Sequence, residues 1–295
     1  MTIHHSLLLV EGRQDALFLS KIFQLHGFRY INNIDEAPDR WSIFINQQRK
    51  KEHLAKLNAN RPGLQLHELF EGVCLIDQGR SIVIQAVGGK RNKFRDKLDA
   101  INVQLEDGLA SLNAIGLLPD ADNNRDGAIQ SSRQYLQAYG FNESVVQDST
   151  HGTPTIGIFS LPNGQSQGGL EELLHECASV VYPNLLNGAK QYVNAIVTQQ
   201  DRYEAEDIHE LRTPQGPAKA VVGCIASVLA PGATIQVSLA NHRWVCETSI
   251  AAINAPSVNA LTTFLRLSIA TKNQPFSQGG WGGCDFLIAT CRSSD

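Results

Sequence analysis

Four short apolar runs alternate, over the first 180 residues, with segments whose apolar residues recur at helical spacing. The runs are Ser6–Val10, Ile82–Ile84, Leu112–Leu118 and Thr155–Leu161. Each is followed by a turn signal and then by a helical pattern. Strands that alternate with helices form βαβ units, in which the strands are parallel and the helices cover the sheet. The pattern therefore predicts an α/β core with a mainly parallel, four-stranded sheet flanked by helices.

The rest of the chain is mainly helical in pattern. Helical spacing covers three stretches, Gly188–Thr198, Ala218–Leu229 and Val258–Ala270. Residues Ile235–Val245 fit a strand and a helix equally well. We therefore expect residues 1–180 to form the core, with an insertion at about 32–80. Residues 181–295 are predicted to form a mainly helical C-terminal extension that packs on the core.

Composition restricts the partners and the compartment. The formal net charge is −4, so any contact with nucleic acid must come from local basic patches or metal ions. A basic stretch at residues 49–51 fits a solvated helix face, and a nucleic-acid-facing role stays open. The six cysteines form no C-x-x-C pair, which is typical of free thiols in a reducing compartment. No leader or membrane-spanning run is present, so we expect a cytoplasmic protein without membrane contact.

Acidic residues follow two of the predicted strands. Glu11 comes after the first run, and Asp120 and Asp122 come after the third. The ends of parallel strands meet at one edge of the sheet, where open α/β folds bind ligands. Residues two apart in extended chain point the same way, and two converging carboxylates repel unless they share a cation or a proton. Mg²⁺ prefers such oxygen ligands. The alternative is that Asp120 and Asn123 cap the following helix, and the spacing alone supports both.

The motifs resemble those of the Toprim superfamily, and of a small standalone branch related to nucleases of the OLD type. The resemblance rests on Leu7-Leu8-Leu9-Val10-Glu11-Gly12-x-x-Asp15, Asp120-x-Asp122, Gly88-Gly89-Lys90-x-Asn92 and Gly169-Leu170-Glu171. It covers about residues 6–174. The glycine that usually follows the paired aspartates is displaced to Gly127. Neither a topoisomerase tyrosine nor a zinc module of the primase kind is identified.

The resemblance implies a Toprim-like fold and a set of roles. Glu11 would act as general acid or base in phosphodiester chemistry, and Glu11, Asp120 and Asp122 would hold Mg²⁺ or Mn²⁺. Glu171 would support a second metal ion, and its alternative is a surface residue favoured in the first turn of a helix.

Other charged residues lie near the predicted strand ends or in the helical segments. Lys90 and Arg125 are expected to bind phosphate. Asp15 is expected to cap a helix. His175, one turn after Glu171, is expected to face solvent, and a role as a ligand stays open. Lys219 lies in the helical region and could reach the site, although the sequence offers little argument for that role.

Together these features predict a Mg²⁺-dependent protein that acts on phosphodiesters, nuclease-like on DNA or RNA. Two alternatives stay open. One is a non-catalytic Toprim module that binds nucleic acid or a nucleotide, and the other is a hydrolase of small nucleotides. Self-association into a homo-oligomer is also left open.

Overall fold

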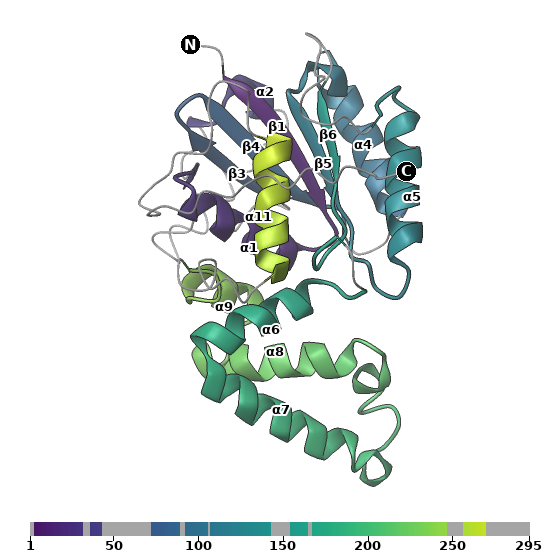
Figure 1. The fold of residues 1–295 in the computed structure, drawn as a ribbon, viewed down its shortest axis with the longest axis vertical. Helices are drawn as coiled ribbons and strands as arrows, with labels where there is room; N and C mark the ends of the chain where they lie inside the picture. Colours follow the sequence, from purple (N-terminus) through teal and green to yellow (C-terminus); the bar gives the residue numbers. More distant parts are fainter. Residues whose placement is uncertain are drawn as a thin grey trace, which may run out of the picture.

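The computed structural model describes residues 3–31, 36–42, 72–88, 92–105, 107–142, 154–164, 167–246 and 256–269. These residues form an α/β fold around one sheet (Figure 1). Its strands are β1 (His4–Val10), β2 (Arg29–Tyr30), β3 (Gly72–Asp77), β4 (Arg80–Ala86), β5 (Ala114–Leu118) and β6 (Thr155–Ile158). The helices are α1 (Arg13–Leu25), α2 (Asp39–Ser42), α4 (Asn92–Gln104), α5 (Arg125–Gln137), α6 (Leu170–Val181), α7 (Pro183–Val197), α8 (Gly216–Leu229), α9 (Ile235–Asn241) and α11 (Pro256–Ile269). Short 3₁₀ turns lie at η3 (Leu109–Ser111), η4 (Gln200–Arg202) and η5 (Glu210–Arg212).

The sheet formed by the described residues has six strands rather than the four predicted, in the order β2-β3-β4-β1-β5-β6. The four expected strands are β4, β1, β5 and β6, and they pair in parallel. Strands β2 and β3 add an antiparallel edge. Strand β3 lies in the segment 32–80 that was expected to be an insertion. It forms a hairpin with β4 through a tight turn at Gly79, where φ is +89°. The basic stretch at residues 49–51 lies outside the described residues.

Alternate residues of the central strand β1 enter two separate cores. Leu8 and Val10 pack in the cluster that includes α1 and α11, whereas Leu7 and Leu9 pack in the cluster that includes α4 and α5. This alternation follows from the two-residue period of side chains in a strand. Figure 1 shows α1 and α11 on one face of the sheet and α4 and α5 on the other. Helices therefore cover both faces, which explains why Leu7–Val10 of β1 is an uninterrupted apolar run.

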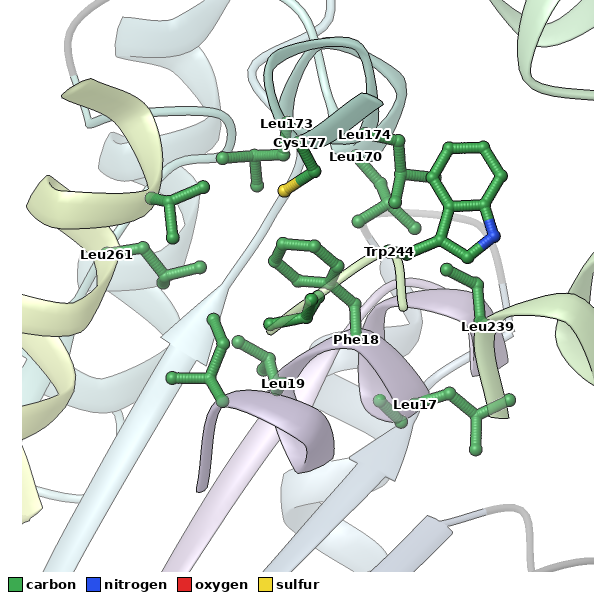
Figure 2. Close-up of a cluster of buried hydrophobic side chains, with 14 of the residues drawn as sticks. Leu17, Phe18, Leu19, Leu170, Leu173, Leu174, Cys177, Leu239, Trp244 and Leu261 are labelled. Carbon is green, nitrogen blue, oxygen red and sulfur yellow. The ribbon is translucent and has the colours of Figure 1, made fainter. Parts of the chain in front are cut away.

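The C-terminal helices share a core with the first helix of the chain. Figure 2 shows Phe18 of α1 among side chains of α6, α9 and α11, with Trp244 beside them. Trp244 is fully buried, and its indole N–H donates to Ser238 Oγ at 2.7 Å. The predicted helices near residues 188–198, 218–229 and 258–270 are confirmed as α7, α8 and α11. The ambiguous segment begins with helix α9.

The predicted boundary at residue 180 does not coincide with a break in packing. Leu173 of α6 and Leu261 of α11 lie on either side of that boundary and belong to the same buried cluster. Figure 1 shows α7 and α8 as the helices farthest from the sheet. The division into two domains stays a prediction.

No disulfide joins the cysteines of the described segments. Cys74 and Cys177 are buried, and Cys224 and Cys246 are half-buried. Among the helices that the structure describes, none is long and apolar enough to cross a membrane.

Candidate functional site

Glu11 and Asp120 meet where the parallel strands end, an edge that we call the carboxyl edge. Strands β1 and β5 are neighbours, with Val10 opposite Leu118, so the residues after them lie side by side. The backbone N–H of Asp120 donates to Glu11 Oε1 at 3.1 Å. The structure therefore brings together two acidic residues that are 109 positions apart in the chain.

The carboxylate of Asp120 is buried in a tight space. Its Oδ1 atom has no hydrogen-bond partner among the described residues. A Cβ atom at Gly169 would stand 2.9 Å from Asp120 Cγ, so only glycine lets the start of α6 approach this closely. Burial raises the pKa of Asp120 well above its usual value, and the charges of Asp15 and Glu11 add to the effect. A buried carboxylate of this kind is costly to ionise without a cation.

Asp122 is held by its backbone at the rim of the site. Its N–H donates to the Gly168 carbonyl at 2.8 Å, and the Gly168 N–H donates back at 3.0 Å. Asp122 has a left-handed backbone with φ of +45°, which is uncommon outside glycine and frequently occurs at functional positions. The side chain is exposed, unlike that of Asp120. The two aspartates therefore offer one buried and one solvent-facing carboxylate.

The structure does not have Asp120 and Asn123 as caps of the following helix, which was the alternative to a metal site. Helix α5 is capped by Asn124, whose Oδ1 accepts from the Gly127 N–H at 2.9 Å. The cap therefore lies beyond Asp120, Asp122 and Asn123. Asp120 and Asp122 therefore do not cap α5, and both lie at the carboxyl edge.

Helices α1 and α6 both begin at this edge, and each is capped by an acidic side chain in its first turn. The Gly12 N–H donates to Asp15 Oδ2 at 2.6 Å, and the Gly169 N–H donates to Glu172 Oε2 at 2.8 Å. Asp15 is thus a helix cap, as the sequence predicts. The Glu172 carboxylate is used by the cap, whereas the charge of Glu171 acts on Asp15 and Asp120. Of these two adjacent glutamates, Glu171 is the one to which the resemblance assigns a role.

Negative charges crowd the interior of the site. The pKa of Asp15 is raised to about 7, chiefly by burial. The charges of Glu11 and Glu171 also raise it, while the Gly12 N–H and Lys219 oppose the rise. Burial also raises the pKa of Glu171, which Lys219 partly offsets. The described site thus contains five acidic side chains, Glu11, Asp15, Asp120, Asp122 and Glu171. Acidic groups with perturbed pKa values in one place are typical of functional sites.

Lys219 reaches this site from α8, and His175 helps to fix that helix. His175 lies one turn after Glu171 on α6 and hydrogen-bonds to the backbone of Ala218. Burial lowers the pKa of His175, with Lys190 adding to the effect. The prediction that His175 faces solvent is therefore wrong, because its ring is half-buried between two helices. The sequence left open that Lys219 reaches the site, and its charge does act on Asp15 and Glu171.

The two residues expected to bind phosphate have different outcomes. Arg125 begins α5, where its Nε–H donates to the Gly164 carbonyl at 2.6 Å and a second N–H donates to Asp126. It lies beside the carboxyl edge, and its phosphate role stays a prediction. Lys90 lies outside the described residues. A nearby lysine, Lys93, donates to the carbonyl of Gly88 at 2.9 Å, and sequence reasoning gave no sign of it.

No three His, Cys, Asp or Glu side chains in the described part of the chain stand in a ready-made arrangement for a metal ion. Mg²⁺ commonly uses only one or two protein carboxylates and completes its shell with water and substrate phosphate. The acidic residues of the carboxyl edge therefore have the right chemistry for Mg²⁺ without forming a closed cage.

Comparison with known proteins identifies the family. The model of DUF3226, described as a protein of unknown function, matches residues 5–268, so the chain belongs to this family. No curated protein matches the sequence. The crystal structure of hypothetical protein PH0156 from Pyrococcus horikoshii OT3 is similar, with 16% identity and a TM-score of 0.47. The match covers 89% of this chain and 95% of that one.

Proposed function

We propose that this protein is a Mg²⁺- or Mn²⁺-dependent hydrolase of phosphodiesters, nuclease-like in acting on DNA or RNA. The observation that carries the proposal is the buried Asp120, whose Oδ1 atom lacks a partner in the described structure while other carboxylates surround it. Such an arrangement costs stability, and a bound cation would remove the cost. We also propose that the fold is Toprim-like, on the strength of the motifs and of their place on adjacent parallel strands.

The donor set fits a hard divalent cation. Asp120 and Asp122 would hold it together with Glu11, and Glu171 would support a second ion. All four offer carboxylate oxygens, the ligands that Mg²⁺ and Mn²⁺ prefer. A bound cation would neutralise charge on the non-bridging phosphate oxygens as the phosphodiester is cleaved.

Glu11 is the residue that we assign to proton transfer. The Asp120 N–H fixes one carboxylate oxygen of Glu11, so the orientation of the group is set before the substrate binds. As general base it would take a proton from the attacking water, and as general acid it would return the proton to the leaving oxygen. Asp15 keeps the adjoining backbone in place through the Gly12 N–H.

A cleavage assay tests the proposal. The purified protein would be incubated with labelled single-stranded DNA, duplex DNA and total RNA, in Mg²⁺, Mn²⁺ or EDTA. Asp120→Asn is the test variant, and Asp201→Asn, at an exposed residue of η4, is the matched control. We expect cleavage that requires metal, is lost in Asp120→Asn and is retained in Asp201→Asn.

Two results would oppose the proposal. Cleavage that is equal in Asp120→Asn and wild type would mean that the site does not act on the polymer. No cleavage of any polymer would favour the alternatives of a binding module or a hydrolase of small nucleotides. The same assay with mononucleotide substrates separates those two.

A further inference from the structure

Lys93 is held beside Glu11 by a short chain of hydrogen bonds. Strand β4 ends next to β1, and the Gly88 N–H donates to the Glu11 carbonyl at 3.0 Å. The Gly88 carbonyl in turn accepts from Lys93 Nζ at 2.9 Å. Gly88 therefore links the two residues, because its N–H bonds to the backbone of Glu11 and its carbonyl bonds to the ammonium group of Lys93. A position fixed in this way distinguishes Lys93 from a freely rotating surface lysine.

The ammonium group keeps capacity for a ligand. It has three N–H donors, and the Gly88 carbonyl accepts one of them. The side chain is exposed to solvent. An anionic oxygen can therefore bind to Lys93 without breaking the contact that positions it.

The order of the strands sets where such an anion would lie. Strand β1, which leads to Glu11, lies between β4 and β5 in the sheet. Lys93 contacts the end of β4 and Asp120 follows β5, so the two lie on opposite sides of Glu11. Neighbouring strands are about 4.8 Å apart, so the ends of β4 and β5 are roughly 10 Å apart. Oxygens of one phosphate group are much closer together than that. The separation is better suited to two successive phosphates along a chain, one at the acidic residues and one at Lys93.

We infer that Lys93 binds the phosphate next to the scissile one, so that the site takes a substrate with linked phosphates rather than an isolated phosphodiester. This inference rests on the proposed function and adds the substrate class. Lysine is a common phosphate-binding residue that acts as a point charge. Linked phosphates occur in a polynucleotide and in a nucleoside polyphosphate, and we favour the polynucleotide because its chain continues on both sides of the scissile bond.

The kinetic test compares Lys93→Ala and Lys93→Arg with a matched control, Arg95→Ala. Arg95 is an exposed cation on the same helix, and it faces Asp99 instead of the strand end. The substrates are a single-stranded oligonucleotide and bis(4-nitrophenyl) phosphate, which has one phosphate. We expect Lys93→Ala to raise KM for the oligonucleotide about tenfold, the effect of losing one charge-assisted hydrogen bond, with kcat unchanged. Hydrolysis of bis(4-nitrophenyl) phosphate should not change, and Lys93→Arg should restore KM. Equal losses on both substrates would overturn the inference.

A binding measurement keeps the inference testable even without turnover. Fluorescence anisotropy with a labelled oligonucleotide in EDTA should show about tenfold weaker binding for Lys93→Ala than for wild type. Unchanged affinity would overturn the assignment of Lys93, while wild-type cleavage would still support the proposed function. A wild type that never cleaves but binds less well after Lys93→Ala would remove the hydrolase and keep the phosphate contact. Competition by a nucleoside triphosphate as strong as that by the oligonucleotide would overturn the choice of a polynucleotide.

Discussion

The two edges of the parallel sheet treat polar side chains in opposite ways. At the amino edge, where the strands begin, Ser81 joins two aromatic residues: its hydroxyl lies 2.7 Å from His5 Nδ1 and accepts from Trp41 Nε1 at 2.8 Å. The rings of His5 and Trp41 meet edge to face, with their centroids 5.6 Å apart. These three polar groups satisfy one another, although His4 Nδ1 at the same edge is buried without a hydrogen-bond partner in the described structure.

At the carboxyl edge the polar side chains are acidic, so their negative charges repel one another. Asp15 and Asp120 are buried near Glu11, and Oδ1 of Asp120 has no partner in the described structure. Such crowding lowers stability unless a cation or protons are present. The same strands therefore carry a structural polar cluster at one end and a destabilising one at the other. Local destabilisation that the rest of the fold tolerates is a mark of function.

The largest expected effect is on activity at the carboxyl edge. Replacing the proposed general base by Glu11→Gln should lower the cleavage rate by about 100-fold to 10,000-fold, the usual range for general acid–base catalysis. The amide can still accept the Asp120 N–H, so the thermal midpoint should not fall. Rates and melting curves of the two proteins would be measured together. Full activity of the variant would remove Glu11 from proton transfer.

At the amino edge we expect the reverse outcome. Trp41 is 1% exposed, so Trp41→Ala should cost about 3–5 kcal/mol of unfolding free energy. Trp41→Phe keeps most of the volume and loses only the hydrogen bond to Ser81, for a cost of about 1 kcal/mol. Denaturant unfolding measures both. The activity of the folded fraction should be unchanged. A variant that loses activity while its unfolding free energy stays the same would contradict the difference between the two edges.

The third effect is a dependence of stability on pH that arises from Asp15. Its pKa is raised from 3.8 to about 7, so the folded state keeps a proton that the unfolded state releases. The contribution of Asp15 to stability is complete below about pH 4 and is lost as the pH rises through 7. Asp15→Asn cannot ionise, so its unfolding free energy in EDTA should vary less between pH 4 and pH 7. Identical pH profiles for the two proteins would mean that Asp15 is ionised in the folded state.

The smallest effect has the opposite sign. Burial lowers the pKa of His5 from 6.5 to about 4, with Arg40 and His4 adding to the effect. The neutral ring is favoured by folding, so its contribution is present above pH 6.5 and is lost as the pH falls toward 4. His5→Gln should reduce this acid-side loss without changing the Asp15 profile. An unchanged acid limb in denaturant titrations would contradict the role of His5.

The sequence supports much of the fold for a physical reason. Runs such as Leu7–Val10 are apolar because helices cover both faces of the sheet, and such runs are visible without a structure. Strand β3 is equally buried, but it pairs antiparallel with β4 and no predicted helix separates the two. The βαβ pattern that revealed the other strands was therefore absent from this part of the chain.

In the candidate site, the sequence could predict a meeting only of those residues whose positions are set by neighbouring strands. Glu11 and Asp120 each follow a strand, so their meeting depends on the sheet alone. The position of Glu171 depends on a cap formed by Glu172, and that of Lys219 depends on how α8 packs against α6. The position of the Lys93 side chain depends on its contact with the Gly88 carbonyl. Contacts of these kinds leave no periodic signal in the sequence.

The central claim is that the carboxyl edge binds a divalent cation, and isothermal titration of Mg²⁺ or Mn²⁺ into the wild type and Asp120→Asn at pH 7.5 tests it most directly. Asp201→Asn serves as the control for the loss of a carboxylate elsewhere. We predict saturable binding to the wild type and to the control, and binding at least tenfold weaker for Asp120→Asn, which should remain folded. Equal affinity in all three proteins, or no saturable binding to the wild type, would contradict the account.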